Sequence, residues 1–106
     1  MLILNPIDHE EIYRLIRSHL PDVQILAYGS RVTGRCYDAS DLDLALRSED
    51  GEPIPRAAIA ELRDALSDSN IPIIVEVRDW ATLPPTFQHE IERHYVYLEP
   101  PAPAQV

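Results

Sequence analysis

The chain has 106 residues and is strongly acidic, with nine basic residues, eighteen acidic residues and a formal net charge of −9. This length corresponds to one small domain with a modest core. Proteins that bind polynucleotides usually present a basic face, because neutralising phosphates drives their affinity. The acidic balance therefore disfavours nucleic acid as the main partner, although a nucleotide could still bind through metal ions.

Cysteine usage and hydropathy indicate the compartment. Cys36 is the only cysteine, so no disulfide can form within the chain, which fits a reducing cytosol. The first residues lack a basic segment followed by a long apolar core, so no signal peptide is predicted. No apolar run approaches the roughly 20 residues of a membrane span. We expect a soluble, cytoplasmic protein with no membrane partner.

The predicted elements follow the order α-β-β-α-β-α-β. Asp8 is predicted to cap a first helix that ends near His19, with Glu11 completing a capping box. Strands are expected over 23–28, 42–46, 73–78 and 95–98, and helices over 56–67 and after Pro84-Pro85. This order predicts an α/β fold, a small mixed sheet flanked by helices, over 1–99. The Pro/Ala-rich stretch 100–106 is predicted to be a disordered tail.

An Asp-x-Asp pair is the first candidate for chemistry. Asp41 and Asp43 are two residues apart on a predicted strand, so both carboxylates project from one face. Two adjacent carboxylates in a cleft repel each other, so keeping both ionised costs free energy. A divalent cation bound between them removes this cost. Oxygen ligands suit Mg²⁺, which uses one or two carboxylates plus substrate phosphates. Taken alone, the pair also fits a solvated strand face.

A Gly-Ser turn precedes this pair in the chain. Gly29 and Ser30 follow a predicted strand directly, where a turn can present N–H groups and a hydroxyl to a phosphate, and glycine lets the main chain approach closely. A third carboxylate is predicted at Glu76. A charged side chain within the apolar strand Ile-Ile-Val-Glu-Val is energetically unfavourable unless it is paired or has a function. A structural ion pair between Glu76 and Arg78 is the alternative.

The spacing of these residues carries a specific resemblance. Gly29-Ser30, ten residues and then Asp41-Leu42-Asp43 match the G-S-x10-D-x-D signature of the DNA polymerase beta-like nucleotidyltransferase superfamily. The short length, Gly34 and the Ser40-Asp41 pair resemble its minimal nucleotidyltransferase branch, over roughly residues 8–98. A P-loop is the rival interpretation of 29–34, but Arg35-Cys36 stands where that motif needs Lys and then Ser or Thr.

The resemblance implies an activity, a cofactor and a partner. Domains of this branch commonly act as antitoxins beside a HEPN-domain toxin, and some transfer AMP from ATP to a toxin tyrosine with two Mg²⁺ ions. The implied catalytic and metal-binding residues are Asp41, Asp43 and Glu76. The implied nucleotide-binding residues are Gly29, Ser30, Arg31 and Ser40. A solvated loop position is the alternative for Arg31.

Two positions depart from the family pattern. Glu76 stands where the third acid is usually Asp, and Thr33 stands where many relatives carry a second basic residue. Either departure is compatible with a weak or inactive enzyme, and Glu76 favours the alternative function, an antitoxin that neutralises its toxin by binding. No room remains for an acceptor-binding domain, so we expect the partner protein to supply the acceptor hydroxyl. Trp80 and Phe87 are expected to belong to the core or to an interface.

Overall fold

The computed structural model describes residues 2–101. One mixed sheet has the strand order β3-β2-β1-β4, in which β1 is antiparallel to β2 and β4, and β2 is parallel to β3. The elements are α1 (Pro6–His19), β1 (Gln24–Tyr28), α2 (Ser30–Thr33), β2 (Leu42–Arg47), α3 (Arg56–Ser67), β3 (Val75–Asp79), the 3-10 turn η1 (Trp80–Thr82), α4 (Pro85–Arg93) and β4 (Val96–Tyr97). The expected α/β fold with a small mixed sheet is confirmed.

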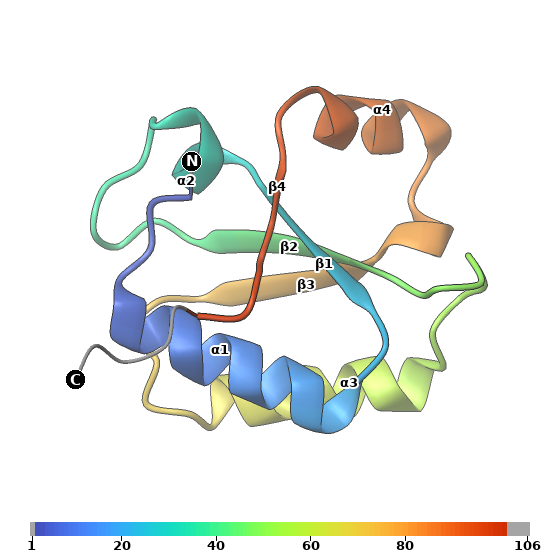
Figure 1. Ribbon diagram of the computed structural model, residues 1–106, viewed down its shortest axis with the longest axis horizontal. Coiled ribbons are helices and arrows are strands. Elements are labelled where there is room, and N and C mark those ends of the chain that lie inside the picture. The colour runs from blue at the N-terminus through green and yellow to red at the C-terminus, as the bar shows by residue number, and fades with distance from the viewer. Residues whose placement is uncertain (1, 102–106) are drawn as a thin grey trace.

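Helices cover both faces of the sheet, with α1 and α3 on one side and α4 on the other (Figure 1). The larger core lies on the side of α1 and α3, and a smaller cluster forms under α4 around Leu26, Ala45 and Ile91. Leu42 and Leu44 of β2 enter the larger core. Since side chains alternate along a strand, Asp43 faces the α4 side.

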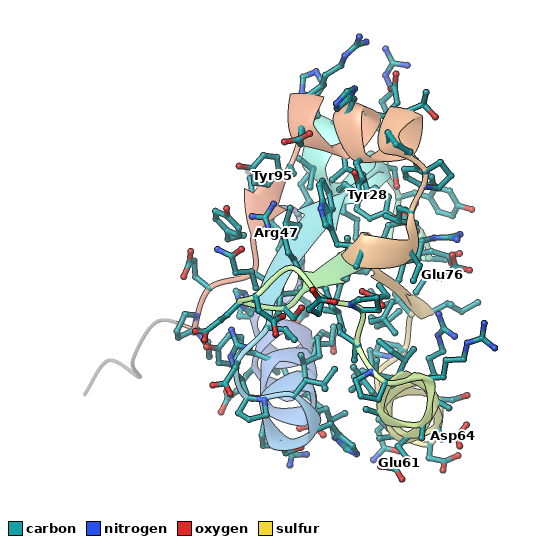
Figure 2. The ribbon with its side chains drawn as sticks, turned by 90° about the vertical axis from the view of Figure 1, so that its right-hand side faces the viewer. Tyr28, Arg47, Glu61, Asp64, Glu76 and Tyr95 are labelled. Atoms are coloured by element: carbon teal, nitrogen blue, oxygen red, sulfur yellow. The ribbon has the colours of Figure 1, made fainter. Side chains whose placement is uncertain are left out.

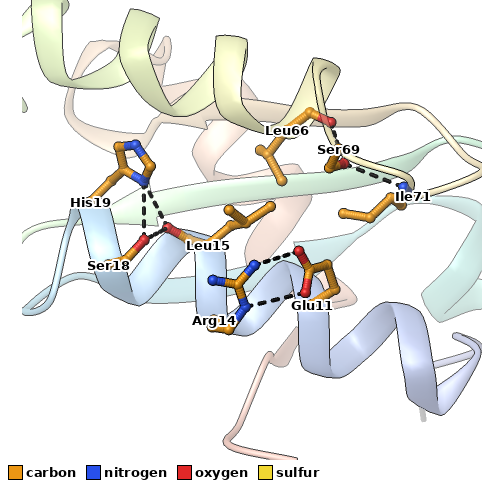
Figure 3. Close-up of polar contacts among 8 residues, drawn as sticks. All are labelled: Glu11, Arg14, Leu15, Ser18, His19, Leu66, Ser69 and Ile71. Carbon is orange, nitrogen blue, oxygen red and sulfur yellow. Dashed lines mark hydrogen bonds and ion pairs between the residues drawn. The ribbon is translucent and has the colours of Figure 1, made fainter.

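The start of α1 differs from the prediction. Asn5, not Asp8, caps the helix, because its Oδ1 accepts the N–H of Ile7 at 2.8 Å, and Pro6 suits the first helical position. Glu11 makes no capping box; it accepts two hydrogen bonds from Arg14, at 2.5 and 3.2 Å (Figure 3). The predicted capping box is therefore wrong, and Asp8 lies within the first turn.

The connection between α3 and β3 makes the strand begin two residues later than predicted. The Ser69 hydroxyl donates to Leu66 O at 2.6 Å and accepts from Ile71 N at 3.3 Å (Figure 3). The chain then bends at Pro72, which has no N–H to offer a ladder. The strand consequently runs over Val75–Asp79 instead of 73–78.

Two short elements, α2 and η1, were not predicted, because turns of three or four residues carry no hydrophobic period. None of the helices within residues 2–101 has both the length and the apolar character that a bilayer crossing requires. Most of the predicted tail, 102–106, lies outside the described residues.

Candidate active site

The acidic residues singled out in the sequence meet at one end of the sheet. Asp43 on β2 pairs in register with Glu76 on β3 and, on its other side, with Tyr28 on β1. In-register neighbours share a face of the sheet, so these three side chains lie on the α4 side. Asp41 precedes Asp43 by two residues, and its charge acts on the Asp43 carboxyl. The predicted adjacency of the second and third acids is present.

Gly29 turns the chain directly against the Asp43 carboxylate. Its backbone angles, φ 82° and ψ −156°, lie in a region that is essentially closed to other residues. A Cβ built there would lie 2.5 Å from Asp43 Oδ2. Gly29 O then accepts the N–H groups of Val32 and Thr33, at 3.0 and 3.1 Å, which starts α2 with Ser30 as its first residue. The Gly-Ser turn and the Asp-x-Asp strand therefore form one site.

The Asp43 carboxyl has a raised pKa in the folded protein. Burial raises the pKa of its carboxyl above the ordinary value, the charges of Glu76 and Asp41 raise it further, and Arg78 lowers it. An ionised Asp43 therefore carries a cost in the free protein, and a cation between the carboxylates would relieve that cost.

The oxygen atoms of the Asp41 and Asp43 carboxylates are suitable ligands for Mg²⁺, whose positive charge would offset the cost of keeping them ionised. Among residues 2–101, no three His, Cys, Asp or Glu side chains are arranged to hold a metal ion. Mg²⁺, however, is usually bound through one or two carboxylates, with substrate phosphates and water as its other ligands. Asp43 lies on β2, whereas Asp41 is exposed and lies one residue before that strand, not on it as predicted. These two residues would supply the two carboxylates.

Glu76 also has a basic neighbour. Arg78 Nη2 lies 3.5 Å from Glu76 Oε2, and about half of each side chain is exposed. The ion pair considered from the sequence is thus present, but exposed pairs of this kind contribute only about 0–1 kcal/mol. Glu76 can therefore turn from Arg78 to another partner at little cost.

An aromatic wall borders the acids and was not foreseen as part of the site. The Tyr28 ring meets the Phe87 ring edge-on, with centroids 5.9 Å apart, and the Arg78 guanidinium lies 5.8 Å from the Phe87 centroid. Burial and then the nearby Asp43 charge raise the pKa of Tyr28. Because Tyr28 directly precedes Gly29 in the chain, the sequence alone could have indicated that its ring lies beside the site. Nothing in the sequence around Phe87 indicated its contact with Tyr28.

Arg31 has a role other than the predicted nucleotide contact. Its side chain is buried, and its guanidinium donates to the carbonyls of Ser40, Ile3 and Asp38 at 3.0, 2.9 and 3.0 Å. Ile3 N donates in turn to Arg31 O at 2.8 Å. These bonds occupy the donors that a phosphate would need. Arg31 is a positioning residue that ties the loop before Asp41 to the N-terminal segment.

The two serines of the motif differ in the same way. Ser40 is buried, and its Oγ accepts the N–H of Tyr37 at 2.9 Å, so it closes the loop on itself instead of facing outward. Ser30 is partly exposed at the Gly29 turn. Of the two, Ser30 is placed where a phosphate could approach.

Removing the buried guanidinium should destabilise the fold. We expect Arg31→Met to lower the free energy of unfolding by about 3 kcal/mol or more, because each of three carbonyls loses a charged donor. Arg35, exposed in the loop that follows α2, is the control, and Arg35→Met should change stability by less than about 0.5 kcal/mol. Urea denaturation measures both, and equal effects would contradict the role given to Arg31.

Comparison with known proteins identifies the family of the chain. The family model described as "Polymerase beta, Nucleotidyltransferase" matches residues 10–99. A relative from Haemophilus influenzae, "Probable protein adenylyltransferase MntA", is 39% identical over 85 residues, which are 80% of this chain and 73% of the relative.

Two solved structures share the fold. A crystal structure of a toxin-antitoxin with AMP-PNP superposes with a TM-score of 0.71 and 23% identity, covering 91% of this chain and 73% of the other. A crystal structure of the toxin-antitoxin MntA-HepT gives a TM-score of 0.67 and 19% identity over 90% and 72% of the two chains. The match over 10–99, together with motif residues that meet at one site, leads to one conclusion: the chain belongs to the polymerase beta nucleotidyltransferase family.

Proposed function

We propose that this nucleotidyltransferase is a Mg²⁺-dependent protein adenylyltransferase that acts as an antitoxin. Its reaction transfers AMP from ATP to a hydroxyl, a tyrosine in our proposal, of a HEPN-domain toxin in the cytoplasm. The relative's name, protein adenylyltransferase, supports the reaction, and the AMP-PNP in a structural neighbour supports the nucleotide. One observation carries the proposal: the Gly29 turn lies against Asp43, whose in-register neighbour is Glu76.

The nucleotide side of the site is built by the turn and β2. Gly29 lets the main chain approach the phosphates, and the Ser30 hydroxyl donates to them. Asp41 and Asp43 are the metal ligands of this side. Mg²⁺, when bound there, supplies positive charge for the phosphate oxygens, as in other phosphoryl-transfer sites. Arg31 and Ser40 do not contact the nucleotide in this proposal; their hydrogen bonds hold the loop that precedes Asp41.

The acceptor side of the site is Glu76. An acceptor oxygen forms a bond to the α-phosphorus, the bond from that phosphorus to pyrophosphate breaks, and the acceptor proton passes to the Glu76 carboxylate. Glu76 is suited to this because about half of its side chain is exposed and it stands beside Asp43. Its longer side chain, compared with the usual Asp, moves its carboxylate farther from the strand backbone. We also assign it a contribution to the second metal ion.

A binding-only antitoxin is the second candidate. The observation that favours it is the Glu76–Arg78 pair at 3.5 Å, because Glu76 must leave this arginine before its carboxylate can reach an acceptor hydroxyl. In that case the chain would neutralise its toxin by covering it, without any transfer.

The charge of Glu76 separates the two candidates. We expect Glu76→Gln to slow AMP transfer by about 10²–10⁴-fold, the usual contribution of a general base, while complex formation with the toxin persists. Glu90→Gln is the matched control, since Glu90 is exposed and also lies within 3.6 Å of an arginine, Arg93. Transfer is followed by the mass of the toxin. A chain that never modifies its toxin, yet neutralises it with Asp43→Asn in place, is the binding-only antitoxin.

A further inference from the structure

A groove runs along the open edge of the sheet, between β3 and α3. Its volume is about 570 Å³, and residues of α3, of the connection 71–74 and of β3 line it. Within residues 2–101 no strand pairs with β3 on this side, because β3 is the end strand of the sheet. In Figure 2, Glu76 lies at this edge, between α3 below and α4 above.

The backbone of β3 is available to a further strand. Ile74 O accepts the N–H of Leu42 at 2.9 Å, so the backbone of Ile74 faces β2. Because the direction alternates along a strand, Val75 and Val77 turn theirs toward the groove. The bond from Arg63 Nη2 to Val77 O, at 2.8 Å, agrees with this. Val75 therefore presents a backbone edge to which an extended segment can add.

An apolar anchor lies beside this backbone edge. The side chain of Ile74 is 64% exposed and lines the groove. Free edge strands are usually protected by charges, proline or a covering element. An exposed isoleucine instead gives a docking segment apolar surface to bury.

The charges of the groove identify the kind of segment that fits. Arg63 makes no ion pair with a carboxylate of residues 2–101; its Nε and Nη2 donate to the backbone oxygen of Val77. Arg78 lies 3.5 Å from Glu76, and its charge also acts on Asp43. The acids of α3 labelled in Figure 2, Glu61 and Asp64, lie on the outer side of the helix, away from the sheet. The charged residues that line the groove are two arginines, Arg63 and Arg78, and one acid, Glu76. In a chain of net charge −9 this lining is locally cationic, so it complements acidic side chains.

Glu76 links the groove to the site. It lines the groove, whereas Gly29, Ser30, Asp41 and Asp43 do not. On its other side Glu76 pairs with Asp43. The nucleotide side and the groove therefore meet at this one residue.

We propose that the groove binds the acceptor segment of the partner protein. This segment is extended and acidic; it adds to β3 at Val75, packs against Ile74 and brings its hydroxyl to Glu76. The inference rests on the proposed function, since it concerns the acceptor of that same reaction.

The test compares two exposed isoleucines in AMP transfer to the toxin encoded beside this chain. Ile74→Gln should raise KM for the toxin about tenfold, with kcat and the Kd for ATP unchanged. Ile7→Gln, at a side chain 77% exposed on α1, should change none of these values. Arg63→Gln should also raise KM, whereas Arg56→Gln, exposed on the same helix, should not. Hydrogen exchange of the Val75 amide should slow in the toxin complex.

Each other outcome has a defined meaning. Transfer by Ile74→Gln with the KM of the wild type overturns the groove and leaves the proposed function standing. An Arg63→Gln variant with unchanged KM overturns the acidic chemistry of the segment. Absence of transfer by the wild type removes the proposed function, and an unprotected Val75 amide in the complex then overturns the groove independently. A dimer of this chain that Ile74→Gln dissociates would assign the groove to a second copy and also overturn the proposal.

Discussion

Replacing Asp43 with asparagine should abolish Mg²⁺-dependent ATP binding and, at the same time, make the free protein more stable. Losing an outer-shell partner of a metal typically costs 10–100-fold in affinity or activity, so we expect loss of a ligand itself to weaken ATP binding by more than about 100-fold. Calorimetry with ATP and Mg²⁺ measures this effect. Binding that survives in Asp43→Asn with an unchanged fold would place the nucleotide elsewhere.

The gain in stability follows from the raised pKa of Asp43. Its cause is burial first, and then repulsion from Glu76 and Asp41. A carboxyl whose folded pKa is raised binds its proton more tightly in the native state, so the free energy of unfolding falls as pH rises through that pKa. At neutral pH the wild type carries this cost, and asparagine does not.

Thermal melting at two pH values checks the sign. The Tm of Asp43→Asn should exceed that of the wild type at neutral pH, and the difference should shrink in acid, where Asp43 is protonated. Asp50→Asn is the control of opposite sign, since hydrogen bonds from Glu52 N and then the Ser48 hydroxyl lower the pKa of Asp50. A lower Tm for Asp43→Asn at neutral pH would contradict the raised pKa of Asp43 in the folded protein.

Gly29→Ala should damage both the fold and the site. The backbone angles of Gly29 cost about 1–3 kcal/mol for any other residue. The new methyl group would also displace the Asp43 carboxylate, which a Cβ meets at 2.5 Å. We therefore expect a lower Tm together with loss of AMP transfer.

Gly34→Ala separates strain from displacement. Gly34 has φ 86°, so alanine is strained there too, but a Cβ would meet nothing within 4 Å. This variant should lose about 1–2 kcal/mol of stability and keep its transfer activity. Equal loss of activity in the two variants at a temperature where both are folded would mean that the Gly29–Asp43 contact has no specific role.

The parts of the site that sequence predicted are those set by local geometry. Strand alternation placed Asp43 opposite the buried Leu42 and Leu44, and Glu76 opposite Val75 and Val77. Asp41, predicted on the same strand as Asp43, lies one residue before it. The sequence predicted that Gly29 and Asp43 lie near each other, because Gly29 directly follows one predicted strand and Asp43 lies on the next strand along the chain. Their contact, and the register of Glu76 with Asp43, required the folded sheet.

The parts that sequence missed depend on contacts between distant segments. Arg31 looked like a phosphate ligand, but an unpredicted helical turn buries it against the carbonyl of Ile3, 28 residues away. Phe87 contacts Tyr28 from α4, on the face of the sheet that this helix covers. At the start of α1, a cap three residues ahead of the predicted one prevailed because Asn5 precedes Pro6. In each case a competing hydrogen bond or packing contact decided the outcome.

Whether this chain is a protein adenylyltransferase is decided by the mass of the toxin after incubation with the chain, ATP and Mg²⁺. We expect a mass increase equal to added AMP, located on a tyrosine, present with the wild type and absent with Asp43→Asn. A toxin that is bound and neutralised by the wild type, with its mass unchanged, would refute AMP transfer and establish the binding-only antitoxin.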